Sequence, residues 1–280
     1  MSDDSLSRRS LLRLDFGRFR APERPDPEPV KAAIAWRWER GAGALHRAWE
    51  PLAPILCDLA DVEDGTRVLD AGTGDGNVAL EAADRGGVVT GVDIAPGQID
   101  RVSDRARELS LTGIWMIADI EALPDLDESY DAVVSAFGLP FAPRPRRAVR
   151  ELLRVLRPGG KLAVAAPARG SLLADVIALA QDGPGALPSG FPSPVAWGDE
   201  EVARERIESV APGTDVDVSI HTLMLRFESE AFAWAALSGP FGLAEHSRDR
   251  FADLIGSRSE RLDSVEIAEP VTVIVARRPG

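Results

Sequence analysis

The most constraining feature of this chain is a run of alternating glycines that follows a short apolar segment. Residues 68–77 read VLDAGTGDGN. The apolar residues suit a strand that is buried on both faces of a parallel sheet, and the glycines remove side chains where a ligand approaches the backbone. Apolar positions in residues 78–84 then fit one face of a helix, for which Asn77 is the predicted cap. A glycine loop that opens a helix in this way favours a nucleoside-binding site.

Residues 88–94, VVTGVDI, supply a second strand with Asp93 near its end. Two strands joined by a helix form a βαβ unit, so both strands are expected to end at the same edge of a parallel sheet. A carboxylate at that edge can accept hydrogen bonds from both ribose hydroxyls, a need shared by NAD and other adenosine cofactors. The alternative is that Asp93 only starts a turn.

The spacing of the glycines distinguishes a site for NAD from a site for another adenosine cofactor. A dinucleotide fingerprint, G-x-G-x-x-G, would need glycine at position 77, where this chain has asparagine. Residues 70–76 instead form D-x-G-x-G-x-G, which resembles motif I of the class I methyltransferases that use S-adenosylmethionine (SAM).

Three later segments extend this resemblance. Residues 114–124 (IWMIADIEALP) and 130–135 (YDAVVS) resemble the third and fourth strands of that family, and residues 156–164 (LRPGGKLAV) resemble the turn into its fifth strand. The match is close over residues 66–167 and holds only in outline elsewhere; within the family it is most similar to the ubiquinone and menaquinone biosynthesis branch. It implies an α/β fold: a Rossmann-like, seven-stranded, mostly parallel sheet with helices on both faces, whose last strand is antiparallel and lies between the fifth and sixth.

The resemblance also implies which residues bind SAM. Asp93 is expected at the ribose, and Asp70 is expected to reach the methionine ammonium group. Asp119 is expected at the adenine amine with Ile120 beside the ring, while Gln98 stands where relatives often carry methionine. The full predicted cofactor site is Asp70, Gly72, Thr73, Gly74, Asp93, Ile94, Gln98, Asp119, Ile120 and Ser135.

The expected chemistry is in-line displacement at the methyl group of SAM. Because SAM is already a charged electrophile, the main task of the protein is to position the acceptor. No catalytic residue is assigned, since none of the histidines has a carboxylate partner that the sequence reveals. The histidines are His46, His221 and His246.

The residues after the predicted fourth strand indicate which classes of methyl acceptor are excluded. The chain there reads SAFGLP, and Ser135 to Phe137 are expected to face the methyl-transfer region. This segment differs from the [DN]-P-P-[YFW] pattern of enzymes that methylate nucleic-acid amines, and it lacks the Asp-Asn pair of a metal-dependent mechanism. The sequence therefore predicts a small organic O-, C- or N-nucleophile and no metal.

The flanks predict the domain organisation. Residues 1–29 are expected to form a flexible arm and residues 30–65 a helical cap. Residues 66–280 are expected to form the SAM-binding domain, with a glycine- and proline-rich lid loop at 171–198 and a helical insertion at 227–262.

Aromatic side chains in the two flanks have two interpretations. Trp38 and Trp49 in the predicted cap either close the pocket or pack as ordinary core, and Phe191 and Trp197 in the lid loop either touch the acceptor or anchor the loop.

Composition narrows the partners and the compartment. Lys and Arg number 32 against 45 Asp and Glu, and the resulting net charge of −13 disfavours nucleic acid and anionic membranes. Cys57 is the single cysteine, which fits a reducing compartment, and no apolar run reaches membrane-spanning length. Residues 7–13 (SRRSLLR) resemble a twin-arginine export motif but lack the apolar core that follows it, so a cytoplasmic protein is predicted. The sequence sets neither the oligomeric state nor the identity of the acceptor.

Two other functions stay open. A non-catalytic SAM-binding or partner-binding protein would keep the glycine loop and lack a cavity for an acceptor. An NAD-dependent oxidoreductase is the more remote alternative, because the glycine spacing opposes it.

Overall fold

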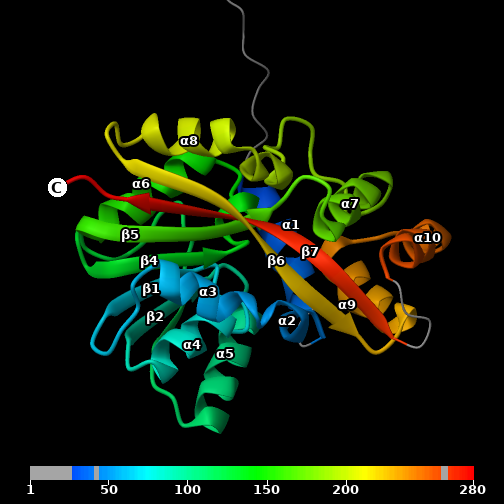
Figure 1. Cartoon of the computed structure of the whole chain (residues 1–280), viewed down its shortest axis with the longest axis horizontal. Helices are drawn as coiled ribbons and strands as arrows, with labels where there is room; N and C mark the ends of the chain where they lie inside the picture. The colour runs from blue at the N-terminus through cyan, green and yellow to red at the C-terminus, as the bar shows by residue number, and fades with distance from the viewer. Residues whose placement is uncertain (1–26, 41–43, 260–263) are drawn as a thin grey trace, which may run out of the picture.

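A seven-stranded sheet forms the centre of the molecule (Figure 1). The computed structural model describes residues 27–40, 44–259 and 264–280. The strands follow the order β3-β2-β1-β4-β5-β7-β6 across the sheet. Their bounds are β1 Arg67–Ala71, β2 Val88–Asp93, β3 Ile114–Ile117, β4 Tyr130–Ala136, β5 Leu156–Pro167, β6 Asp215–Phe227 and β7 Val265–Arg277.

The direction of the strands confirms the predicted fold class. β1 pairs in parallel with β2 and β4, and the outer pairs β2·β3 and β4·β5 are parallel as well. β7 runs antiparallel to both β5 and β6 and lies between them. The carboxyl ends of β1, β2, β3 and β4 consequently meet at one edge of the sheet, where ligands bind in open α/β folds.

Alternating apolar residues explain why the central strands are buried on both faces. Val68 of β1 belongs to a core shared with α3 and α4, whereas its neighbour Leu69 faces a second core shared with α6 and α8. Ala132 and Val133 of β4 divide in the same way. Successive side chains of a strand point to opposite faces, so an uninterrupted apolar run is what a covered parallel strand requires.

Helices and short 3-10 turns cover the sheet and its ligand edge. The helices are α1 Pro27–Arg40, α2 Ala44–Trp49, α3 Leu52–Leu59, α4 Asn77–Asp84, α5 Pro96–Leu109, α6 Pro145–Val155, α7 Leu172–Leu179, α8 Glu200–Glu208, α9 Glu230–Phe241 and α10 Arg248–Arg258. The 3-10 turns are η1 Leu139–Phe141, η2 Ala180–Asp182, η3 Pro194–Gly198 and η4 Glu245–Ser247. None of the helices within the described ranges is both long and apolar enough to cross a membrane.

The amino-terminal flank forms three helices. α1 packs against α5 and α9, α2 against α9 and β6, and α3 against α4. α1 begins at Pro27, so the last residues assigned to the flexible arm belong to a helix, because proline is tolerated in a first helical turn. The rest of the predicted arm, residues 1–26, lies outside the described residues.

The segment predicted as a lid loop, residues 171–198, contains the helix α7 and the short turns η2 and η3, and α8, α9 and α10 follow it along the chain. The Ser171 hydroxyl accepts a hydrogen bond from the Ala174 N–H and so caps α7. Trp197 in η3 is fully buried in the core beneath α6 and α8, which agrees with the anchor alternative for this residue. Neither Trp197 nor Phe191 lines the large cleft described below.

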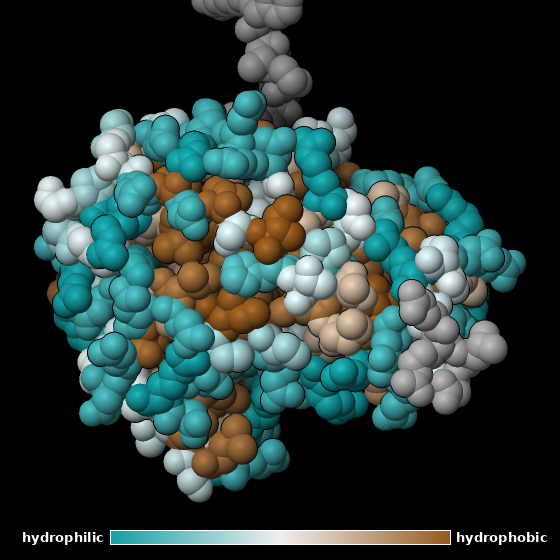
Figure 2. Space-filling view, in the orientation of Figure 1, coloured by the Kyte–Doolittle hydropathy of each residue, from teal (hydrophilic) through white to brown (hydrophobic). Residues whose placement is uncertain are grey.

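Some apolar side chains are exposed on the surface of the molecule. On the face shown in Figure 2, apolar side chains lie among polar ones in the middle of the view, where β6 and β7 cross the front in Figure 1. Ile220 and Met224 of the edge strand β6 are 69% and 43% exposed.

Candidate functional site

A deep cleft opens at the carboxyl ends of the parallel strands. Its floor comes from the segments that follow β1, β2, β3 and β4, and α1 and α2 cover it. The cleft contains about 1340 Å³ of empty space including its open mouth. Its lining includes both the glycine loop and aromatic side chains of α1 and α2, among them Trp38 and Trp49, so one continuous cleft reaches both.

Most of the predicted site residues meet in this cleft. Its lining includes Gly72, Thr73, Gly74, Asp93, Ile94, Gln98, Asp119 and Ile120. The other two predicted residues, Asp70 and Ser135, lie beneath the lining.

The glycine loop lies against the ends of β2 and β4. The N–H groups of Gly72 and Thr73 both donate to the Val92 carbonyl, at 2.9 and 2.8 Å. Gly72 has φ +77°, and a Cβ there would come within 2.7 Å of the Gly138 Cα, so only glycine permits this approach. A Cβ on Gly74 would meet nothing within 4 Å, because this part of the loop faces the open cleft.

The predicted helix cap at Asn77 is wrong. α4 begins at Asn77, and its cap position is Gly76 with φ +94°, without a side-chain cap. The Asn77 side chain instead donates from Nδ2 to the His46 carbonyl at 2.8 Å and so ties α4 to α2. Because glycine alone adopts this left-handed conformation readily, it took the position that the sequence pattern gave to asparagine.

Asp70 supports the glycine loop from below. It is 1% exposed, and its Oδ2 accepts hydrogen bonds from the Thr73 hydroxyl at 2.9 Å and the Ala79 N–H at 3.0 Å. Burial raises the pKa of Asp70 to about 7, although these two hydrogen bonds oppose the shift. The structure therefore places Asp70 between the loop and α4 rather than on the cleft surface.

Ser135 has a similar supporting position under the turn after β4. Its hydroxyl donates to the Ala71 carbonyl at 2.6 Å and accepts from the Leu139 N–H at 2.9 Å. These bonds join the ends of β1 and β4. The neighbouring residues Ala136 and Phe137 line the cleft, whereas Ser135, which the sequence predicted to face the same region, is buried beneath it.

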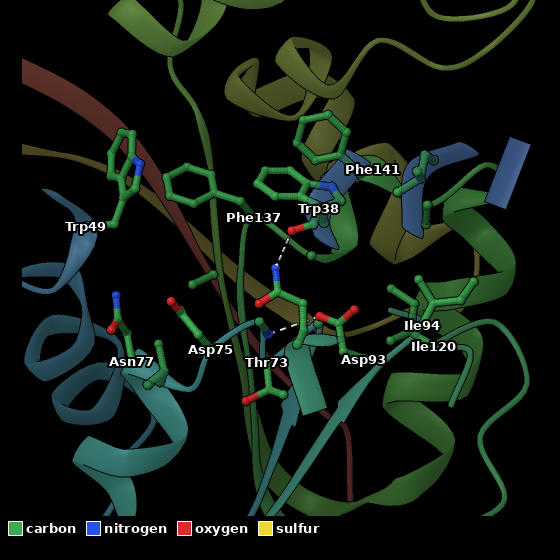
Figure 3. Close-up of a pocket in the computed structure, with 18 of the residues that line it drawn as sticks. Trp38, Trp49, Thr73, Asp75, Asn77, Asp93, Ile94, Ile120, Phe137 and Phe141 are labelled. Carbon is green, nitrogen blue, oxygen red and sulfur yellow. Dashed lines mark hydrogen bonds between the residues drawn. The ribbon is translucent and has the colours of Figure 1, made fainter. Parts of the chain in front are cut away.

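Asp93 is the acid at the end of β2, and its orientation is fixed. One carboxylate oxygen accepts from the Gly74 N–H at 2.9 Å (Figure 3), and the other accepts from the Ala95 N–H at 2.9 Å. Burial raises the pKa of Asp93, and the backbone hydrogen bonds counteract part of that effect. Each oxygen of a carboxylate can accept more than one hydrogen bond, so Asp93 keeps acceptor capacity toward the cleft.

Asp119 has a partner that the sequence did not reveal. Lys31 of α1 places its Nζ 2.5 Å from Asp119 Oδ2 and 3.0 Å from Glu121 Oε2. Lys31 is only 6% exposed, and Glu121 also accepts from Arg144 Nε at 2.7 Å. Burial by itself lowers the pKa of Lys31, but the hydrogen bonds and charges of the two carboxylates outweigh it and the net shift is upward. This ion pair fastens α1 over one end of the cleft.

Gln98 gives α1 a second attachment. It is buried in α5, and its Nε2 donates to the Trp38 carbonyl at 3.0 Å (Figure 3). In the same view Ile94 and Ile120 lie together at one end of the cleft, beyond Asp93. This end is thus apolar on its walls and acidic at Asp93 and Asp119.

Aromatic rings form the opposite wall of the cleft. Trp49 and Phe137 make an edge contact with centroids 4.7 Å apart, and Trp38 contacts both Phe141 and Phe241 at 5.6 Å. Figure 3 shows four of these rings along one side, across from Asp75 and Asp93. Two of the tryptophans that the sequence left undecided therefore line the cleft.

Phe137 is held in a strained conformation. Its φ of +62° lies in the left-handed region that favours glycine, and its N–H donates to the Ala165 carbonyl at 3.1 Å. Such conformations cost about 1 to 3 kcal/mol and concentrate at functional sites. The strain turns the ring into the cleft wall, where it contacts Trp49.

The histidines differ sharply in their surroundings. His46 lines the cleft, and its Nδ1 lies 3.4 Å from Asp75 Oδ2, a carboxylate that also lines the cleft. His221 lies on the edge strand β6 with its Nε2 3.2 Å from the Ser219 hydroxyl, and neither it nor His246 lines the cleft. The sequence could not pair His46 with Asp75, because only the folded chain brings α2 beside the start of α4, where Asn77 donates to the His46 carbonyl.

The cysteine thiol and a possible metal site are the remaining candidates for a chemical role. Burial raises the pKa of the Cys57 thiol to about 12, so this cysteine stays protonated in the core. Among the described residues, no group of three or more His, Cys, Asp or Glu side chains is arranged to hold a metal ion.

Sequence comparison places the chain among methyltransferases. A family model described as a methyltransferase domain matches residues 69–164. Two uncharacterized proteins of Mycobacterium tuberculosis are 34% and 38% identical, over 64% and 59% of this chain. The matched segments span 66% and 61% of those proteins, which is just under two thirds of their length. The 27-O-demethylrifamycin SV methyltransferase of Amycolatopsis mediterranei is 31% identical over 66% of this chain and 68% of its own length.

Solved structures share the fold. The YcgJ protein from Bacillus subtilis superposes with a TM-score of 0.61 at 17% identity, covering 81% of this chain and 98% of that one. A putative methyltransferase from Bacillus halodurans gives a TM-score of 0.60, also at 17% identity, over 81% and 99% of the two chains. At this level of identity the superpositions show a common architecture.

Proposed function

This chain belongs to the class I SAM-dependent methyltransferases, and we propose that it transfers the methyl group of SAM to a small organic acceptor with an aromatic or otherwise apolar body. The observation that carries the proposal is the division of one cleft into two parts. Fixed carboxylates and the glycine loop lie on one side, and a wall of aromatic rings lies on the other.

The residues on the polar side fit an adenosine cofactor. We assign Asp93, which keeps acceptor capacity, to the ribose hydroxyls, and Asp119, which lines the same cleft, to the adenine amine. Ile94 and Ile120 offer apolar surfaces for the ring, and the open space over Gly74 accommodates the remainder of the molecule. When bound, SAM supplies a sulfonium methyl group that is already activated for transfer.

The aromatic side supports the choice of acceptor. Flat rings prefer edge-to-face or offset contacts with other rings, and Trp49, Phe137 and Phe141 present such surfaces to the cleft. The relative from Amycolatopsis is named for a methylation on oxygen, so a hydroxyl comes first among the O-, C- and N-nucleophiles that we propose.

The chain's part in the reaction is to position the acceptor and exclude water. Holding two reacting atoms in near-attack range, about 3 to 3.5 Å, accounts for several kcal/mol of an activation barrier. Helices α1 and α2 cover the cleft from above, with Lys31 and Gln98 fastening α1 in place. The left-handed backbone conformation of Phe137 orients its ring toward the acceptor side of the cleft.

The shape of the cap favours an enzyme over a non-catalytic SAM-binding protein. A binding protein needs no acceptor space, whereas here the aromatic side of the cleft remains open beside the glycine loop. The acidic net charge of −13 supports a small molecule rather than nucleic acid as the acceptor. The cytoplasmic location stays a prediction from the sequence.

A labelled-methyl assay tests the proposed function. The protein is incubated with SAM carrying a labelled methyl group and a panel of hydroxylated, aminated and carbon-acid aromatic compounds. We expect label in at least one phenolic product, and its loss in an Asp93→Ala variant. Transfer confined to nucleic acid or protein acceptors would contradict the proposal. So would a protein that binds SAM, transfers no label to any compound, and has no space on the aromatic side of the cleft in a structure of its SAM complex.

A further inference from the structure

A second, smaller pocket adjoins the aromatic side of the cleft. Its lining comes from α1, η1, α7, η2 and the end of α9, together with the loop that follows η2. Four residues line both spaces, and they are Ile34, Trp38, Phe141 and Phe241. Trp38 and Phe141 lie next to each other in Figure 3. The cleft and the second pocket therefore share one apolar wall of side chains.

Arg37 of α1 is the charged group of this second pocket. No other ionisable side chain is found among the described residues that line it. Within the part of the chain that the structure describes, Arg37 forms no ion pair. Burial lowers the pKa of Arg37, and no carboxylate counteracts that effect. A cation that leaves water without an anionic partner costs stability, and an anionic ligand would offset that cost.

The guanidinium group of Arg37 is held in place but is not saturated with hydrogen bonds. Its Nη1 donates to the Gly185 carbonyl and its Nη2 to the Pro184 carbonyl, both at 3.0 Å. The Gly185 N–H donates to the Gly242 carbonyl at 2.8 Å, which fixes this loop against the end of α9. A guanidinium has five N–H donors, so the two bonds to carbonyls leave three for a ligand.

The chemistry of the pocket favours a carboxylate as the anion. The planar guanidinium fork matches the two oxygens of a carboxylate. A dianionic phosphate is better matched by two cations, and the described lining offers Arg37 alone. The other lining side chains are mostly apolar, so they suit an apolar chain that leads to the carboxylate.

We propose that the methyl acceptor is an aromatic carboxylic acid whose hydroxyl lies on the aromatic side of the cleft and whose carboxylate binds Arg37. This inference rests on the proposed function and names the class of its acceptor. The chain between ring and carboxylate has to cross the shared wall, where Trp38 contacts Phe141 and Phe241 at 5.6 Å between ring centroids. Ring contacts of this kind tolerate repacking, so the wall can part around an apolar chain.

Pairs of an acid and its amide test the proposal. The probes are hydroxyphenylpropanoic, hydroxyphenylpentanoic and hydroxyphenylheptanoic acid, each compared with its own primary amide. Titration calorimetry measures their binding to the protein saturated with S-adenosylhomocysteine. We expect at least one acid to bind about tenfold more tightly than its amide, because the amide keeps the size and loses the charge.

Arg37→Met should abolish the preference for the acid and leave the affinities for the amide and for S-adenosylhomocysteine unchanged. Arg150→Met is the matched control, since Arg150 is exposed on α6 and lines neither space. This control should keep the full preference for the acid.

The outcomes distinguish this inference from the proposed function. The inference is overturned if no acid binds more tightly than its amide, or if Arg37→Met keeps the preference. An equal loss of acid and amide affinity in Arg37→Met would also overturn it, because an arginine that only fastens α1 to the loop predicts that result. Methyl transfer to neutral phenols without any gain from a carboxylate would retain the proposed function and reject the inference. Failure of the unaltered protein to bind S-adenosylhomocysteine would overturn the proposed function itself.

Discussion

The two sides of the cleft are built by different parts of the chain and held by different forces. On the cofactor side, Gly72, Gly74 and Asp93 come from two consecutive strand ends and are fixed by backbone hydrogen bonds of 2.9 Å. On the acceptor side, Trp38 and Phe241 come from opposite ends of the sequence and are fixed by ring contacts. Hydrogen bonds fix direction, whereas apolar contacts tolerate repacking.

This difference implies that the two sides can change independently. A variant on the cofactor side should alter the binding of every adenosine ligand, whatever the acceptor. A variant on the acceptor side should alter the acceptor's KM and leave cofactor affinity unchanged. The following predictions are arranged by the size of the expected effect.

Asp93→Ala should weaken S-adenosylhomocysteine about a hundredfold. The substitution removes the ribose acceptor and leaves the N–H groups of Gly74 and Ala95 without their partner. Titration calorimetry measures the effect, with Asp217→Ala on the exposed edge of β6 as control. Unchanged affinity would refute the ribose assignment.

Asp70 should affect the stability of the fold in a pH-dependent way, because burial raises its pKa. In the folded protein its pKa of about 7 lies above the ordinary value of 3.8, so protonation favours the folded state. This contribution is fully present below pH 3.8 and is lost as the pH rises through about 7.

Relative to Asp70→Asn, the unaltered protein should therefore gain about 2 kcal/mol of unfolding free energy between pH 8 and pH 5. Urea unfolding at the two pH values measures the difference, in which groups common to both proteins cancel. A constant difference between the two proteins would show that Asp70 is ionised in the folded state across this range.

Lys31→Met should weaken S-adenosylhomocysteine about tenfold. The variant removes the cation that joins α1 to Asp119 and Glu121, and the 1% exposed side chain of Glu121 would keep only Arg144. Rapid-mixing measurements should show the change mainly in the dissociation rate.

The other lysine of the chain provides the control for this variant. Lys161 lies 2.6 Å from Asp61 and does not line the cleft, so Lys161→Met should leave ligand affinity unchanged. Tighter binding by Lys31→Met would mean that Lys31 competes with the adenine amine for Asp119.

Trp49→Leu should produce the smallest of these effects, a rise of about fivefold in the acceptor's KM. The variant removes the ring that contacts Phe137 at 4.7 Å but keeps an apolar side chain. Steady-state kinetics with the acceptor found in the label assay measures it. Trp36→Leu is the control, since Trp36 is 56% exposed and does not line the cleft. A comparable loss of S-adenosylhomocysteine affinity would show that the two sides are coupled.

The sequence predicted the sheet and the cofactor side because both depend on local patterns. A parallel strand, its glycine loop and the acid at the next strand end lie within a short stretch, and Asp93 and Gly74 meet as soon as a βαβ unit forms. The antiparallel β7 between β5 and β6 followed from the family resemblance and is also confirmed.

Contacts between segments that are distant in the sequence could not be predicted from local patterns. Lys31 and Asp119 are 88 positions apart, and the pairing of His46 with Asp75 needs α2 to pack beside α4. Asn77 has the composition of a helix cap, yet Gly76 occupies that position and the asparagine amide binds the His46 carbonyl. Periodicity reports which face of an element is buried, but not which partner covers it.

Titration of the unaltered protein with SAM and with NAD tests the central claim most directly. We expect saturable binding of one SAM per chain, and no binding of NAD at the same concentrations, because Asn77 replaces the last glycine of a dinucleotide loop. Binding of NAD without binding of SAM would contradict it.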